Sequence, residues 1–184
     1  MRETSDIIAN INALLDRLSR IIASEGWEGD LNPAQTAALN YLARANRFSR
    51  SPSVVAEYLG ATRGTVSQTL KALHRKGLVE ESPNPTDKRS ISYRLTKSGE
   101  ELVGRKRQLY EVLDALSEKD RSDLEAQLGQ VVSTALKKRG LTTFGACKSC
   151  KHHLVTEKGI HCALLDLPLR PEETEQICVE QTVL

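Results

Sequence analysis

The chain has 184 residues, a formal net charge of +2, and a composition that is 39% hydrophobic but only 4% aromatic. This length suits one domain with an appendage, and a core of aliphatic side chains favours helices. The sequence has neither a signal-peptide pattern nor an apolar run long enough to cross a bilayer, which disfavours secreted and membrane proteins and predicts a cytoplasmic one.

The first predicted helix covers residues 6–23 and is strongly amphipathic. Its apolar stripe is wider than one partner helix would need; it consists of Ile7, Ile8, Ile11, Leu14, Leu15, Leu18, Ile21 and Ile22. A second helix is predicted from Asn32 as its cap and Pro33 in its first turn. It ends near Asn46.

Residues 51–75 have the pattern of two short helices joined by a tight turn. Gly60 suits the left-handed position that ends the first helix, and Thr62 is a good cap for the second. In the second helix Val66, Leu70 and Leu73 recur at helical spacing and predict a buried stripe. Two serines at the start of the pair, Ser51 and Ser53, are weak candidates for contacts to a phosphate backbone.

The outward face of the second helix is polar and cationic, and it carries no carboxylate. It consists of Arg63, Thr65, Ser67, Gln68 and Lys71. Such a face fits a DNA major groove, where Gln pairs well with adenine and Arg with guanine or phosphate. The alternative is a surface helix that merely lacks acidic residues.

The next segment predicts a β-hairpin with a basic tip. Residues 78–81 and 91–95 alternate between apolar and polar side chains, and the stretch between them is rich in turn residues. Lys88 and Arg89 lie at the tip, where they could reach phosphates, and Arg89 the adjacent minor groove. The alternative is a solvated loop. Helix, turn, helix and basic hairpin in this order predict a winged helix-turn-helix that binds DNA.

Two further helices follow the hairpin. Thr96 is the predicted cap of a long helix that runs through Leu113, and Ser117 caps a last helix that ends before Gly140. Their apolar patterns favour a role in dimerisation. The sequence up to this point shows no nucleophile–base pair, paired carboxylates or phosphate-cradling loop, so an enzyme is disfavoured.

Residues 5–140 resemble the MarR family of bacterial winged-helix regulators. The resemblance is carried by the helix that ends in Gly, the Thr-rich second helix, and the stretches "KALHRKGLVEE", "DKRS" and "YRLTKSGEEL". It implies a homodimer on a pseudo-palindromic operator, with the second helix of each motif in the major groove. It also implies that the first and last helices interlock across the dimer axis. The wing motif Asp-x-Arg of the family matches Asp87 and Arg89.

All four cysteines lie in the tail, residues 141–184, with the spacing C-x2-C-x11-C-x15-C. They are Cys147, Cys150, Cys162 and Cys178. Such clustering predicts one metal site, and the tail is too poor in large apolar residues to fold on a core of its own.

The spacing leaves the metal open. Zinc accepts four thiolates, but zinc ribbons usually have two C-x2-C pairs and this tail has one. One close pair with two dispersed thiolates slightly favours an iron–sulfur cluster. His152, His153 and His161 lie near the cysteines; one could replace a thiolate, but the full set of cysteines favours a role as polar neighbours. A thiol switch is a third option, which the tail's weak core disfavours.

The sequence therefore predicts a mainly α fold with a small β-hairpin wing, divided into a DNA-binding and dimerisation domain at residues 1–140 and a metal-binding tail at 141–184. The predicted function is that of a homodimeric transcriptional regulator whose metal centre senses redox state or iron. Loss of the cluster would then loosen the tail against the dimerisation helices. The alternative is a zinc-stapled regulator whose tail is structural or recruits a partner protein. A hydrolytic metal site is disfavoured, since four thiolates leave no open position for water.

Overall fold

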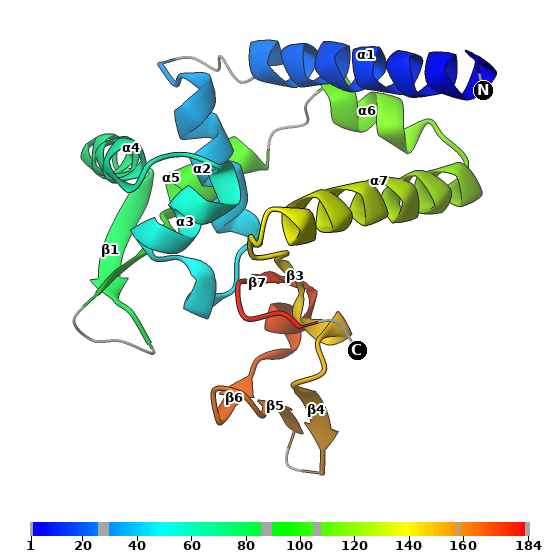
Figure 1. The fold of residues 1–184 in the computed structure, drawn as a ribbon. Helices are drawn as coiled ribbons and strands as arrows, with labels where there is room; N and C mark the ends of the chain where they lie inside the picture. Colours follow the sequence, from blue (N-terminus) through cyan, green and yellow to red (C-terminus); the bar gives the residue numbers. More distant parts are fainter. Residues whose placement is uncertain (1, 26–29, 86–89, 105–107, 158, 183–184) are drawn as a thin grey trace.

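The computed structural model describes residues 2–25, 30–85, 90–104, 108–157 and 159–182, and within them the chain is mainly helical (Figure 1). The elements before the tail are α1 (Arg2–Glu25), α2 (Pro33–Arg44), the 3₁₀ turn η1 (Arg47–Ser49), α3 (Pro52–Leu59), α4 (Arg63–Arg75), β1 (Val79–Pro83), β2 (Ile91–Leu95), α5 (Lys97–Val103), α6 (Gln108–Asp114) and α7 (Glu118–Lys138). The order of α3, α4, β1 and β2 confirms the predicted winged helix-turn-helix.

Local capping chemistry explains where these helices begin. At the start of α2, α4, α5 and α7 a side-chain oxygen accepts a hydrogen bond from the backbone N–H three residues further on. The four capping residues are the predicted Asn32, Thr62, Thr96 and Ser117. Gly60 has φ of 62° at the end of α3, which is the left-handed conformation that its position requires.

The wing is an antiparallel hairpin in which Val79 pairs with Leu95 and Pro83 pairs with Ile91. The tip residues Lys88 and Arg89 lie outside the described residues. A close approach at Gly99 fixes α5 against the hairpin, because a Cβ at that position would overlap the carbonyl oxygen of Leu78.

A single aliphatic core joins α2, α3, α4 and the hairpin. Its fully buried members include Leu39, Leu42, Val55, Leu70 and Leu73. The predicted stripe of α4 is therefore confirmed. Ile177 of the tail belongs to the same core, and Phe144 packs against it.

The helices α1, α6 and α7 extend to one side of the winged-helix unit (Figure 1) and leave large apolar side chains in contact with solvent. Ile8 is 64% exposed, Leu14 is 66% exposed and Val131 is 57% exposed. The sequence predicts one helix from Thr96 through Leu113, whereas the described residues form α5 and α6. Gly104 ends α5 as its C-cap, and glycine is a poor helix former. No helix in the described part of the chain is long and apolar enough to span a membrane.

The tail folds into short strands and 3₁₀ turns: β3 (Gly145–Ala146), η2 (Cys147–Ser149), β4 (His153–Thr156), β5 (Gly159–Cys162), β6 (Leu167–Leu169), η3 (Pro171–Glu175) and β7 (Ile177–Cys178). Strand β3 pairs with β7, and β4, β5 and β6 form a separate antiparallel sheet. Pairing of β3 with β7 brings the first pair of cysteines next to the last one.

Candidate DNA-binding surface and cysteine centre

The outward face of α4 collects the side chains that the sequence predicts. Because Val66, Leu70 and Leu73 point into the core, the opposite face is open to solvent. Four of the predicted residues are exposed, namely Arg63, Thr65, Gln68 and Lys71. The fifth, Ser67, is half-buried. Figure 1 shows α4 end-on at the outer edge of the unit, beside β1.

The start of α4 holds a compact polar cluster. The Thr65 hydroxyl lies 2.8 Å from the Thr62 hydroxyl, which also accepts the hydrogen bond of the Thr65 N–H at 3.1 Å. At the other end of the helix, His74 Nδ1 lies 3.0 Å from the carbonyl oxygen of Val79 and joins α4 to the wing. Thr62 is exposed and was not among the predicted contact residues, since a cap is expected to serve its own helix.

The two predicted backbone-contact serines differ in exposure. Ser51 is the N-cap residue of α3 but is buried, and its hydroxyl lies 3.0 Å from the hydroxyl of Ser53. Ser53 is exposed. Of the pair, Ser53 is the one whose side chain faces solvent.

The wing is fastened to the start of α3. The Tyr93 N–H donates to the carbonyl oxygen of Arg50 at 3.1 Å, and Arg50 Nε donates to the carbonyl oxygen of Ala45 at 2.9 Å. Burial lowers the pKa of Arg50. The Tyr93 hydroxyl donates to Glu81 at 2.7 Å, and burial together with this hydrogen bond raises the pKa of Tyr93 to about 12. The segment between α2 and α3 thus sets the position of the wing.

The four cysteines gather at one place and are all buried, with 4–7% of each residue exposed. Burial, and next the charges of Cys178, Cys162 and Cys150, raise the pKa of Cys147 to about 12. The thiols are therefore close enough to interact electrostatically. They come from three short elements: Cys147 and Cys150 from η2 and its C-cap, Cys162 from β5, and Cys178 from β7.

Several N–H groups surround these thiols. The Thr182 N–H donates to Cys150 Sγ at 3.3 Å. Burial raises the pKa of Cys178, and the nearby amides of Asn46 and of the Glu180 backbone lower it again in part. Donors around sulfur favour a charged thiolate.

Two buried nitrogens beside the cysteines make no hydrogen bond of standard geometry within the described residues. They are Asn46 Nδ2 and His153 Nε2. His153 pairs with Cys162 across β4 and β5. The backbone N–H of His153 donates to the carbonyl oxygen of Cys150 at 3.0 Å. Buried polar atoms without partners are rare in proteins. The Asn46 amide does lie close enough to the Cys178 thiol to lower the pKa of that thiol.

The other histidines are placed differently. His161 Nε2 lies 3.0 Å from an Asp166 carboxylate oxygen, and the carbonyl oxygen of His152 accepts the Ala163 N–H at 2.9 Å. No three His, Cys, Asp or Glu side chains within the described ranges form a ready-made set for a metal ion. The metal centre therefore stays a prediction. Four buried thiols with N–H donors beside them are chemically suited to such a centre.

The cysteine-rich tail docks on η1, the turn that leads into α3. Arg47 Nη1 lies 2.9 Å from a carboxylate oxygen of Glu173, and Arg47 Nη2 donates to the carbonyl oxygen of Pro168 at 2.7 Å. The Val179 N–H donates to the Ser49 hydroxyl at 2.9 Å. Phe48 is buried between thiols and apolar side chains; its cluster contains Cys147, Cys162 and Leu169.

A second contact lies at the other end of α3. The ring of Phe144 stands edge-on to Tyr58 with centroids 5.2 Å apart and to Tyr41 with centroids 6.4 Å apart. Thr142 donates a hydrogen bond to Glu57. Together with the contacts at η1, these contacts hold both ends of α3. The predicted action of the tail on the dimerisation helices stays a prediction. Ile177 belongs to the winged-helix core and Phe144 packs against it, so these two residues of the tail are anchored in the domain before it.

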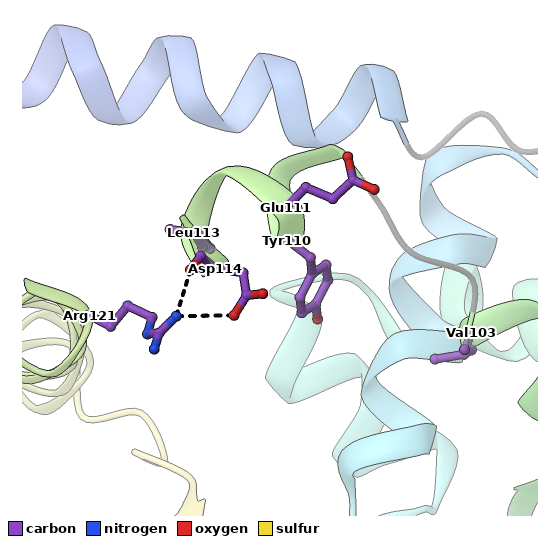
Figure 2. Close-up of a pocket in the computed structure, with 7 residues that line it drawn as sticks. Val103, Tyr110, Glu111, Leu113, Asp114 and Arg121 are labelled. Carbon is purple, nitrogen blue, oxygen red and sulfur yellow. Dashed lines mark hydrogen bonds and ion pairs between the residues drawn. The ribbon is translucent and has the colours of Figure 1, made fainter. Parts of the chain in front are cut away.

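A pocket of about 510 Å³ lies where α5, α6 and α7 meet (Figure 2). Val103, Tyr110 and Leu113 form apolar walls. Arg121 Nη1 donates to the carbonyl oxygen of Asp114 at 2.8 Å and lies 3.0 Å from its carboxylate. Tyr110 is 62% exposed, so the pocket opens among the solvent-facing apolar residues of these helices.

Residues 29–90 match the sequence model of the MarR family. This segment contains α2, α3, α4 and the first part of the wing. A search of curated proteins found no match.

Solved structures with this fold include two DNA complexes. FabT of Streptococcus pneumoniae in complex with DNA has a TM-score of 0.54 and 20% identity, and the match covers 73% of this chain and 99% of FabT. The MepR–DNA complex of S. aureus has a TM-score of 0.51 and 23% identity, with 69% of this chain and 96% of MepR covered. At this identity the likeness shows the fold, a MarR-like winged helix.

Proposed function

We propose that this protein is a homodimeric transcriptional regulator of the MarR type that binds duplex DNA in a sequence-specific manner through α4. The observation that carries the proposal is the outward face of α4, which is exposed, polar, cationic and free of carboxylates. The fold supports it, since FabT and MepR share that fold and are seen bound to DNA.

Each residue of the α4 face has a proposed role. Gln68 reads adenine, and Arg63 reads guanine or binds phosphate in the major groove. Thr65, Ser67 and Lys71 add contacts to base edges or to the backbone. In the wing, Lys88 and Arg89 would reach the phosphates and the adjacent minor groove. Ser53 is the better of the two serines for a backbone contact, because Ser51 is buried.

The exposed apolar faces of α1, α6 and α7 support the homodimer. So many exposed large apolar side chains on three helices are unusual on a monomer and mark an interaction surface. A second copy would cover it and place two α4 helices on one duplex, as half-sites of a palindrome require.

The test is selection of a duplex from a randomised pool, followed by fluorescence anisotropy with the selected and a scrambled duplex at several salt concentrations. Gln68→Ala should lower affinity for the selected duplex by about 10-fold and affect the scrambled one much less. Lys71→Ala should weaken both and reduce the salt slope by about 1. Lys119→Ala, at the start of α7, is the control and should change neither. Recovery of no preferred duplex, even at low salt, would overturn the proposal.

We also propose that Cys147, Cys150, Cys162 and Cys178 hold one metal centre, with an iron–sulfur cluster slightly favoured over zinc. The buried thiols, the Thr182 N–H at Cys150 and the Asn46 amide beside Cys178 fit an anionic sulfur centre. An iron–sulfur cluster would supply sensitivity to oxidants or to iron supply. The chain's own part is to bury the thiols, surround them with N–H donors and fasten the tail to η1.

The second reading is a zinc-stapled tail that is structural or recruits a partner protein. Anaerobic purification with an absorption spectrum and metal analysis separates the two, because a colourless, iron-free, zinc-loaded protein excludes the cluster. Cys162→Ser adds a second test. If the tail is a sensor, the DNA affinity of the variant should first lose its response to oxidants. If the tail is a zinc staple, the variant should lose the folded tail.

A further inference from the structure

Asn46 is buried at the junction of α2, η1 and the tail. Its side-chain oxygen accepts two hydrogen bonds, whereas its side-chain nitrogen makes none of standard geometry with the described residues. The residue is fully buried. Its Oδ1 accepts hydrogen bonds from the Phe48 N–H at 3.2 Å and from the Ser49 hydroxyl at 2.8 Å. Its backbone N–H donates to the carbonyl oxygen of Ile177 at 2.9 Å. The Oδ1 of Asn46 therefore stabilises the η1 turn, and the backbone N–H of Asn46 binds strand β7.

The donor half of the same amide faces the cysteines. Asn46 Nδ2 makes no hydrogen bond of standard geometry with any described residue, although it interacts with the thiol of Cys178. A buried donor without an acceptor costs about 1–3 kcal/mol, so an acceptor is expected beside it. A metal-bound thiolate is a strong, charge-assisted acceptor, whereas a neutral thiol is a weak one.

We propose that Asn46 is a positioning residue of the metal centre: its Nδ2–H donates to the metal-bound Cys178 sulfur while its Oδ1 holds the η1 turn. This inference rests on the metal centre of the proposed function. It assigns one side chain the task of joining that centre to α3. The η1 turn leads directly into Ser51, the N-cap of α3, so occupancy of the centre acts on the DNA-reading pair of helices.

The route from η1 onward consists of hydrogen bonds. The carbonyl oxygen of Ser49 accepts from the Tyr41 hydroxyl at 2.7 Å, and that of Arg50 accepts from the Tyr93 N–H in the wing. A shift of η1 after loss of the metal would therefore move the start of α3 and strand β2 together.

The experiment compares the full-length, metal-loaded protein with two variants. Asn46→Asp keeps an oxygen acceptor but, when ionised, has no donor, and Asn46→Ser replaces the whole amide with one shorter hydroxyl that no longer extends as far as Cys178. Hydrogen-bonding neighbours of metal ligands typically contribute 10- to 100-fold to metal affinity. We expect at least about 10-fold faster metal loss to EDTA for both variants, and a DNA affinity that changes less on metal removal than in wild type. Thr174→Ala is the control: it removes a hydrogen bond to the carbonyl oxygen of Pro171 within η3 of the same tail and leaves the Asn46 amide in place, so its metal-loss rate should stay close to that of wild type.

A measurement on wild type covers the case in which the variants fail to fold. The side-chain amide resonances of Asn46 should shift downfield in the zinc-loaded protein relative to the metal-free protein, as expected for a hydrogen bond to thiolate. Unchanged resonances, or variants that release metal at the wild-type rate, would overturn the role of Asn46 while the metal centre stands. Wild-type protein that binds neither iron nor zinc would instead overturn the metal centre itself, and with it the inference.

Discussion

The guanidinium of Arg47 lies 2.9 Å from the carboxylate of Glu173, whose side chain is only 5% exposed, and this pair joins η1 to η3 across 126 residues of sequence. Glu173 also accepts the Arg170 N–H at 2.8 Å. One carboxylate thus caps η3 and fastens the tail to the winged helix.

Replacing Arg47 with Ala should destabilise the docked tail by about 3 kcal/mol, because the variant leaves a buried carboxylate without its cation. Urea unfolding of the metal-loaded protein measures the effect. Lys148→Ala is the control, since its partner Glu175 and Lys148 itself are both more than half exposed, and it should change little. Equal effects of the two variants would contradict the importance of the buried pair.

A second prediction concerns the contact between α5 and the wing. Gly99→Ala should destabilise the protein by about 2–3 kcal/mol, since the new Cβ would overlap the backbone oxygen of Leu78, which cannot move alone. Gly64→Ala in α4 is the matched control: the nearest atom to its Cβ would be Thr62 Oγ1 at 3.9 Å. It should be neutral or stabilising by up to about 1 kcal/mol through helix propensity. Thermal unfolding followed by circular dichroism distinguishes them.

A third prediction tests the dimer. Ile8→Glu places a charge in the apolar face of α1, which a second chain would have to bury, and should convert the dimer to monomer. Ala9→Glu lies on the opposite side of the same exposed helix and should leave the dimer intact. Analytical ultracentrifugation reads the mass directly. A wild-type protein that is monomeric at micromolar concentration would contradict the proposed assembly.

Local signals made the winged helix predictable from the sequence. Thr62 and Thr96 are caps whose chemistry acts within three residues, and Gly60 takes the backbone conformation that only its side-chain-free Cα tolerates easily. The stripe of α4 needs only helical periodicity. Each of these features can be seen in a short window of sequence.

The docking of the tail could not be predicted in the same way. Asn46 resembles an ordinary helix end, and Phe144 lies in a loop-like stretch, so neither shows a pattern. Their roles depend on partners such as Ile177 and Tyr58, which are distant in sequence and have no periodic relation to them. Cysteine spacing predicted that the four thiols gather, but not that they gather beside η1.

The last prediction concerns the wing at alkaline pH. The pKa of Tyr93 is raised from 10.0 to about 12, first by burial and then by its hydrogen bond to Glu81. The folded protein therefore holds the phenolic proton more tightly than the unfolded chain does. The stability that this provides is fully present below pH 10 and is lost as the pH rises towards 12.

Tyr93→Phe should accordingly be less stable than wild type at pH 9 by about 1 kcal/mol, the usual contribution of one such hydrogen bond. The difference should shrink between pH 10 and pH 12, since wild type loses its advantage there while the variant has no phenol to ionise. Urea midpoints measured from pH 9 upward give the profile. Tyr110→Phe removes the hydroxyl of a tyrosine that is 62% exposed and should follow wild type throughout. A constant gap between Tyr93→Phe and wild type over the whole range would show that the Tyr93 hydroxyl does not carry the alkaline transition.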